Sequence, residues 1–157
     1  MNRRTFSSLR YRNYRIFFAG QAVSQTGSWM QRIALGWFVL QLTHSAFAVG
    51  VLAVAQFLPF TIFGLFGGVL TDRLDARRLV IGTQVAQLAT AIALAWIAIA
   101  HIAQPWMLYS IAFLNGLVLV LDVPSRQQLT YRMVGREALP NAIALNASLF
   151  NASRIFG

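Results

Sequence analysis

The sequence has no cysteine, little charge and very few acidic residues. Of its 157 residues 11% are charged, with four Asp or Glu against 13 Lys or Arg, and 57% are hydrophobic. Without cysteine the chain can form neither a disulfide nor a thiolate metal site. A soluble domain of this length rarely combines so little charge with so much apolar content. The composition therefore indicates a membrane protein.

Five apolar runs divide the chain, and they cover residues 14–42, 46–70, 79–100, 106–129 and 140–157. A helix rises about 1.5 Å per residue, so the complete runs can cross a hydrocarbon core about 30 Å thick. The first run is too long for a cleavable signal peptide. We therefore expect an all-α, polytopic membrane helix bundle. A basic N-terminal segment covers 1–13, and a partial transmembrane domain covers 14–157, with its fifth helix cut short.

Arginines gather in alternate connections. They lie before the first run (Arg3, Arg4, Arg10, Arg12, Arg15), after the second (Arg73, Arg77, Arg78) and around the end of the fourth (Arg126, Arg132, Arg136). The connections after the first and third runs contain no Lys or Arg. Because Lys and Arg are retained on the cytoplasmic side, this predicts a cytoplasmic N-terminus. The basic residues form no single solvated face, which excludes nucleic acid as a partner despite the net charge of +9.

Proline and glycine positions agree with these boundaries. Pro105 and Pro140 are expected in the first turns of the fourth and fifth helices, where a missing N–H costs nothing. Pro59 lies within the second run and predicts a kink. Small residues in the same run allow a neighbouring helix to approach closely, and they are Gly64, Gly67 and Gly68.

Polar side chains inside the runs are the candidate functional residues, since such groups usually face a bundle interior or a wet cavity. In the first run they recur on one narrow stripe of the helix: Gln21, Gln25, Ser28 and Arg32. The fourth run adds Asn115, Asp122 and Arg126, and the fifth adds Asn146, Asn151 and Arg154. Hydrogen bonding between helices is the alternative explanation, and for Thr83, Gln87 and Thr90 of the third run it is sufficient.

Arg32 and Arg154 are the exceptional members of this set. Counted from the cytoplasmic ends of their runs, both lie at a similar depth in the outer half of the membrane. A charged Arg there costs at least about 2.5 kcal/mol unless it is solvated or paired, and the four acidic residues all lie on the cytoplasmic side. We therefore expect the two arginines to share one polar site that holds water, an anionic ligand or a partner outside this sequence.

Three segments resemble the major facilitator superfamily, in particular the branch of enterobactin-type siderophore exporters and macrolide-efflux proteins. They are the charged loop 68–79, residues 13–25, and the stretch from Asp122-x-Pro124-Ser125-Arg126-Gln127 to Asn146. The resemblance implies a bacterial plasma-membrane transporter that exports a bulky organic compound. It also implies a twelve-helix fold, of which this chain holds helices one to five. A small-molecule substrate and the missing C-terminal half are then its partners beside the bilayer.

The resemblance also assigns roles to the charged loop. In the family the Gly begins the motif, the Asp caps a helix of the other half, and the Arg residues tie cytoplasmic helix ends together in one access state. By match these roles fall on Gly68, Asp72, Arg73 and Arg77, with Asp122 and Arg126 of the fourth helix completing a conformational latch. Asp75 stands where the wider superfamily usually has Gly, and Ala76 where it often has Arg. The remaining polar residues form the candidate substrate cavity: Gln21, Gln25, Ser28, Arg32, Asn115, Asn146, Asn151 and Arg154.

Other classes of protein remain open from the residues alone. A small complete multidrug carrier would need a membrane-embedded carboxylate, and the first three helices have none. An intramembrane enzyme would need a nucleophile with a base, or a metal set, whereas His44 and His101 lie on different outer connections. No catalytic residue, cofactor or metal site is expected. A reading frame that continues past codon 157 with further apolar spans would separate the transporter from a small membrane protein or a truncated product.

The arginine asymmetry predicts the topology of the connections. A cysteine placed at Ser45 should react with an impermeant thiol reagent added outside intact cells, because that connection faces outward. A cysteine placed at Ala76 should not react from outside. Mass-shift labelling of the two variants measures this, and the reverse labelling pattern would contradict the orientation.

Overall fold

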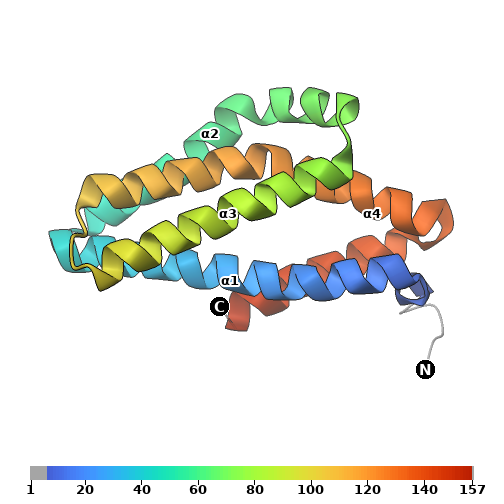
Figure 1. Cartoon of the computed structure of the whole chain (residues 1–157), viewed down its shortest axis with the longest axis horizontal. Helices are drawn as coiled ribbons and strands as arrows, with labels where there is room; N and C mark the ends of the chain where they lie inside the picture. Colours follow the sequence, from blue (N-terminus) through green and yellow to red (C-terminus); the bar gives the residue numbers. More distant parts are fainter. Residues whose placement is uncertain (1–6, 157) are drawn as a thin grey trace. The chain divides into compact units, whose positions relative to one another are not determined.

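The computed structural model describes residues 7–156, and all of its regular structure is helical (Figure 1). A short 3-10 helix η1, Ser7–Arg10, is followed by four α-helices. These are α1, Arg12–Thr43; α2, Ala46–Arg73; α3, Ala76–Ile99; and α4, Pro105–Phe156. No strand occurs among the described residues, which confirms the all-α prediction. The predicted N-terminal segment lies partly outside the described residues, and Arg3 and Arg4 with it.

Helix α4 contains both the fourth and the fifth predicted spans. Its 52 residues would extend to about 78 Å at about 1.5 Å per residue, far more than a hydrocarbon core requires. The helix breaks at Gly135, whose φ of 67° and ψ of −176° fall in a region that essentially only glycine adopts. Two helical segments, 105–134 and 136–156, therefore meet at a single residue.

This geometry corrects two sequence expectations. A connection was expected over residues 130–139, but Val134 and Ala138 on either side of Gly135 are helical and buried against Tyr14. Apolar contact with α1 therefore keeps the chain helical up to the glycine. Pro140 is the fifth residue after Gly135 and lies in the second turn of its helix rather than the first. Pro105 does begin its helix, as expected.

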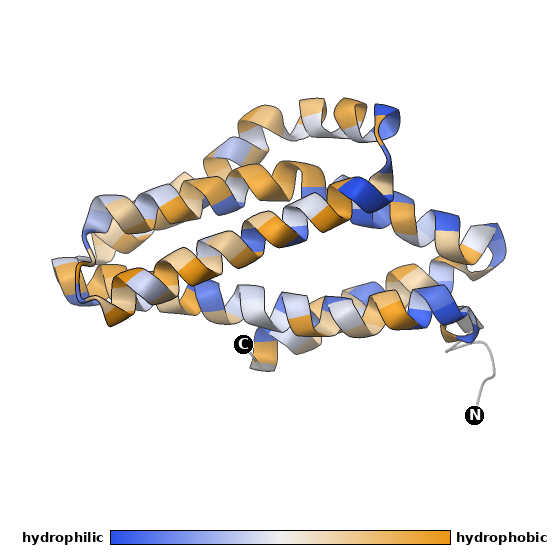
Figure 2. Ribbon diagram, in the orientation of Figure 1, coloured by the Kyte–Doolittle hydropathy of each residue, from blue (hydrophilic) through white to orange (hydrophobic). Residues whose placement is uncertain are grey.

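Three described helices, α2, α3 and α4, are long and apolar enough to cross a membrane. Helix α1 has sufficient length at 32 residues, but its polar stripe lowers its apolar content below that of the other three. Large apolar side chains remain exposed on α2, such as Phe47, Leu65 and Phe66, and apolar residues recur along all four helices in Figure 2. An exposed apolar surface of this extent fits a lipid environment.

The connections between the helices are short. Asp75 is the N-cap of α3 and accepts a hydrogen bond from the backbone N–H of Arg78 at 2.9 Å. Ser45 caps α2 in the same way. His44 and His101 follow α1 and α3 with left-handed φ values of 49° and 54°, which histidine adopts more readily than most residues. The exposed His44 and Arg77 are therefore suitable alternative positions for the cysteines of the topology experiment.

The described chain divides into two compact units. The central unit comprises residues 31–126, and the terminal unit comprises the described parts of 1–30 and 127–157. In the central unit, Leu35, Leu52, Leu94 and Leu108 belong to one buried apolar cluster. Helices α1 to α4 all contribute to this cluster, so it is the core of the unit.

In the terminal unit, the start of α1 packs against the segment after Gly135. Tyr14 is fully buried, and its hydroxyl lies 3.2 Å from Ala142 O and 3.0 Å from Asn146 Oδ1. Ser8 donates to Asn141 Oδ1 from both its N–H and its hydroxyl. These contacts advance in the same direction along both segments, so the first and fifth predicted helices run parallel within this unit. This parallel orientation is expected when successive membrane spans alternate in direction, because the first and fifth spans then cross the membrane the same way.

Close approach of α2 and α4 in the central unit depends on two glycines. A Cβ at Gly67 would collide with the backbone carbonyl and side chain of Val120, and one at Gly116 with the carbonyl of Gln56. Gly64 and Gly68 have open space at the corresponding position. Of the three glycines that were expected to admit a neighbouring helix, Gly67 alone does so. Pro59 is buried within α2, which bends along its length in Figure 1.

We expect Gly67→Ala to destabilise the central unit by about 1–3 kcal/mol, because α2 and α4 must move apart to accommodate the methyl group. Gly64→Ala is the matched control, since it adds the same methyl group to the same helix in open space. Unfolding of both variants in mixed detergent micelles measures the difference in free energy. Equal stability of the two variants would contradict the close packing.

Candidate functional site

The predicted site residues fall into both units. The central unit holds the charged loop and the polar side chains of α4's first half: Gly68, Asp72, Arg73, Arg77, Asn115, Asp122 and Arg126, together with Arg32. The terminal unit holds Gln21, Gln25, Ser28, Asn146, Asn151 and Arg154. The shared site of Arg32 and Arg154 stays a prediction, because the two residues belong to different units.

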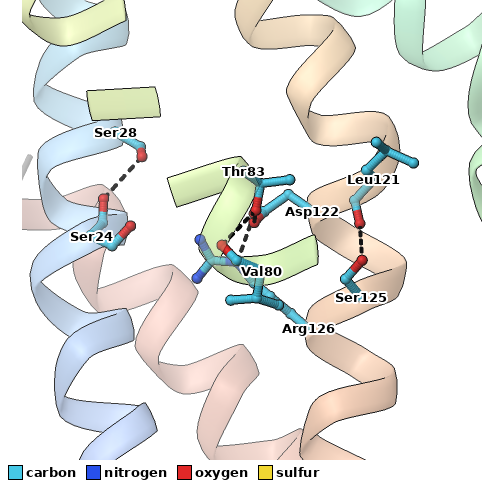
Figure 3. Close-up of polar contacts among 8 residues, drawn as sticks. All are labelled: Ser24, Ser28, Val80, Thr83, Leu121, Asp122, Ser125 and Arg126. Carbon is cyan, nitrogen blue, oxygen red and sulfur yellow. Dashed lines mark hydrogen bonds and ion pairs between the residues drawn. The ribbon is translucent and has the colours of Figure 1, made fainter. Parts of the chain in front are cut away.

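A buried polar cluster joins α3 to α4 in the central unit (Figure 3). Asp122 is 4% exposed, and its two carboxylate oxygens have different partners. The Thr83 hydroxyl donates to Oδ1 at 2.7 Å, and Arg126 Nε donates to Oδ2 at 2.6 Å. A carboxylate inside an apolar helix is tolerated when it is paired and hydrogen-bonded in this way. The Asp-x-Pro-Ser-Arg pattern therefore places the Asp and the Arg one helical turn apart, where they form an ion pair.

A second polar cluster lies two turns further along α3. The Thr90 hydroxyl donates to Asn115 Oδ1 at 2.8 Å, and Gln31 Nε2 of α1 approaches Thr90 Oγ1 at 3.4 Å. Three helices of the central unit meet at this point. The sequence expectation that Thr83 and Thr90 bond across to a neighbouring helix is confirmed, whereas their individual partners could not be read from the sequence.

The charged loop is shorter than expected, because α2 extends to Arg73 and α3 begins at Ala76. Asp72, Arg73 and Arg77 are exposed, and Gly68 is a half-buried helical residue. Asp122 was expected to pair with the loop arginines, but the contacts that the structure gives its carboxylate come from Thr83 and Arg126. The role of Asp122 in a latch with Arg73 and Arg77 stays a prediction.

In the terminal unit, the residues of the polar stripe of α1 differ in burial and in hydrogen bonding. Gln21 is 5% exposed, and its Oε1 is buried without a hydrogen-bond partner. Gln25 and Ser28 are half-buried, and the Ser28 hydroxyl donates to Ser24 O of its own helix at 2.9 Å (Figure 3). Gln21 is therefore a member of the stripe with a buried acceptor atom that lacks a donor.

The two predicted asparagines of the last helical segment are in different environments. Asn146 accepts from Tyr14 through Oδ1 and approaches Thr130 Oγ1 at 3.5 Å through Nδ2. Both ends of its amide are thus engaged in packing contacts. Asn151 is exposed and donates to Ala147 O of its own helix at 2.9 Å. The structure therefore favours interhelical packing as the explanation of Asn146.

Arg154 has an aromatic neighbour that the sequence did not indicate. Its guanidinium carbon lies 6.0 Å from the centroid of the Trp29 ring, and the Trp29 ring meets Phe150 edge-on at a centroid distance of 5.6 Å. A guanidinium over an indole face is stabilised by the quadrupole of the ring. Helical spacing places Trp29 beside the polar stripe, but only the packing of α1 on residues 150–154 brings it to Arg154.

The described residues offer no cluster of side chains that could hold a metal ion. Over residues 7–156 no group of three or more His, Cys, Asp or Glu side chains comes together. The polar clusters described above consist instead of hydroxyl, amide, carboxylate and guanidinium groups from neighbouring helices.

The sequence profile of the transmembrane secretion effector family matches residues 3–157. This chain belongs to that family of major facilitator superfamily transporters. The predicted membership of that superfamily is confirmed. The chain is accordingly an all-helical, multi-pass membrane protein of a transporter family.

Curated relatives of this family member carry transport-related names. Macrolide efflux protein A of Streptococcus pyogenes is 28% identical over 150 residues, which are 93% of this chain and 37% of that protein. The staphyloferrin A transporter of Staphylococcus aureus is 27% identical over 90% of this chain and 36% of its own length. Multidrug resistance protein MdtH of Salmonella typhimurium is 31% identical over 76% of this chain and 29% of its own length. The chain spans about a third of these relatives, and no solved structure gives a significant match.

The contact between Trp29 and Arg154 predicts an energetic coupling in the terminal unit. Trp29→Leu and Arg154→Gln should each destabilise the unit, and a double-mutant cycle should give a coupling energy of about 0.5–1 kcal/mol. Trp29→Phe should retain part of this coupling, because phenylalanine keeps an aromatic face. Thermal unfolding of the unsubstituted chain, the two single variants and the double variant in detergent measures the cycle, and strictly additive effects would exclude the interaction.

Proposed function

We propose that this chain is the N-terminal part of a secondary active transporter that exports a bulky organic compound across a bacterial inner membrane. The observation that carries the proposal is the family match over residues 3–157 together with relatives named for macrolide efflux, staphyloferrin A transport and multidrug resistance. In this proposal the N-terminus is cytoplasmic, and a C-terminal half completes the transport pathway.

The cargo in this proposal meets the polar side chains of the apolar spans. Gln21 supports a binding role best, because a buried amide oxygen without a donor has an unfulfilled hydrogen bond that a cargo hydroxyl or ammonium group can satisfy. Gln25, Asn151 and Arg154 are half-buried or exposed in the same unit. Ser28 and Asn146 have internal partners and are the weaker members. Arg32 and Asn115 belong to the central unit, and their part in cargo binding stays a prediction.

The charged loop acts as the conformational latch in this proposal. Exposure of Asp72, Arg73 and Arg77 supports it, since charges at a solvated rim can exchange partners as the helices move. The ion pair of Asp122 and Arg126 lies on the same half of α4 that contacts α2 through Val120. Gly68 lies one residue beyond the contact of Gly67 with Val120.

Accumulation of a radiolabelled macrolide in cells tests the transport proposal. Expression of the full-length gene product should lower accumulation in energised cells, and an uncoupler should abolish the difference. Accumulation that is unaffected by expression, for a macrolide and for a ferric siderophore alike, would contradict export of this class of compound.

Asp72→Asn should lower export several-fold while protein abundance in the membrane stays the same, because an exposed charge contributes little to folding. Asp75→Asn is the matched control. It removes the same charge from the same loop, but asparagine caps a helix as well as aspartate does, so export should persist. Equal export by both variants would contradict the latch role and leave the loop with a role in membrane topology alone.

A further inference from the structure

The two polar clusters of the central unit share one helix register. Thr83 bonds to Asp122 and Thr90 bonds to Asn115, so a step of seven residues up α3 corresponds to a step of seven residues down α4. The helices are therefore antiparallel, with two hydrogen-bonded rungs two turns apart. Continuing the same register sets Leu94 opposite Ile111, and both belong to the buried core of the unit.

Each rung is buried where the helices meet. Thr83 is 6% exposed and Asp122 is 4% exposed, while Thr90 is 9% exposed. Gln31 of α1 reaches the second rung from a third helix. Buried polar groups need partners inside the protein, because no water in the hydrocarbon region can replace them.

This arrangement discriminates between registers. A slip of one helical turn would set Thr83 opposite Val118 or Leu119 in one direction, and opposite Ser125 or Arg126 in the other. In each of these registers Asp122 or Asn115 faces an apolar residue of α3 and loses its donor. A slip of seven residues would pair Thr83 with Asn115 but would leave Asp122 opposite Ala76. Only the observed register satisfies both side-chain oxygens of α4, whereas leucine and valine contacts alone would tolerate several registers.

Threonine suits this role because its hydroxyl has a second acceptor on its own helix. Thr83 Oγ1 lies 3.0 Å from Val80 O, and Thr90 Oγ1 lies 2.8 Å from Gln87 O. Each hydroxyl has one hydrogen, which bonds either within α3 or across to α4. When α3 and α4 are apart, the hydroxyl is satisfied within α3, so α3 can insert into the membrane before it pairs.

We propose that Thr83 and Thr90 are positioning residues that set the register of α3 and α4 and thereby hold the Asp122 carboxylate with one oxygen directed to Arg126. The proposal concerns the pairing of two helices, and it stands independently of the transport proposal. Its consequence is that the partners of Asp122 and Asn115 are determined by α3, a helix that contributes no residue to the predicted cavity.

Disulfide cross-linking in the full-length gene product tests the register. Residues 1–157 contain no cysteine, so an introduced pair is free of background once any cysteine beyond residue 157 has been replaced. Ala86→Cys with Leu119→Cys places this pair midway between the two rungs. Ala86→Cys with Val123→Cys is displaced by one turn and reports a slipped register. The first pair should cross-link readily in membranes and the second should not.

Addition of Thr83→Val and Thr90→Val should lower cross-linking of the first pair several-fold and raise that of the displaced pair, because both rungs are lost while the side-chain volume is retained. Thr83→Ser with Thr90→Ser should restore the original pattern. Thr61→Val is the matched control, since the Thr61 hydroxyl of α2 is exposed and donates to Phe57 O of its own helix.

Unchanged cross-linking in the double valine variant would overturn the proposal, as would an equal loss with Thr61→Val or a failure of serine to restore it. Immunoblots of the membrane fraction normalise each measurement to inserted protein. If the double valine variant is not inserted, the single variants Thr83→Val and Thr90→Val give the same comparison, each with a smaller decrease expected. No decrease in either single variant would then count against the proposal.

Discussion

The need to satisfy polar groups without water governs the described structure. Inside a hydrocarbon core every hydrogen-bonding group must find its partner within the protein, and a charged group must be paired or reach a wet surface. The cluster of Thr83, Asp122 and Arg126 meets this need through three side chains from two helices. Tyr14 and Asn146 meet it in the terminal unit. Polar residues that would suggest a ligand site in a soluble protein therefore serve first as connections between helices.

Close helix packing is a condition for these connections. A side-chain hydrogen bond has a narrow range of lengths, so neighbouring backbones must come near enough for threonine or asparagine to reach across. Gly67 against Val120 and Gly116 against Gln56 allow α4 to approach α2, and the opposite face of α4 then meets α3. The small residues and the polar residues of α4 thus act together: the former set the distance between helices, and the latter select the register.

Much of the fold could be predicted from the sequence, because run length and composition are local properties. The starts of α2 and α4 agree with the apolar runs, and the family match covers the charged loop and the fifth predicted helix. The break at Gly135 was not located, since the residues on both sides suit a helix and only φ at the glycine marks the boundary. The contact of Trp29 with Arg154 was missed for another reason, because the rotation of one helix against another is not a local property.

The same distinction explains the site residues. Helical spacing grouped Gln21, Gln25 and Ser28 on one face, but it could not separate an amide oxygen without a partner from a hydroxyl that bonds to its own helix. Likewise the sequence identified Asp75 only as a departure from the superfamily pattern. The structure gives it a reason: Arg77 and Arg78 lie in the first turn of α3, where the helix dipole disfavours positive charge, and the Asp75 carboxylate caps that turn. Two arginines that favour cytoplasmic retention can therefore begin a helix because a capping side chain precedes them.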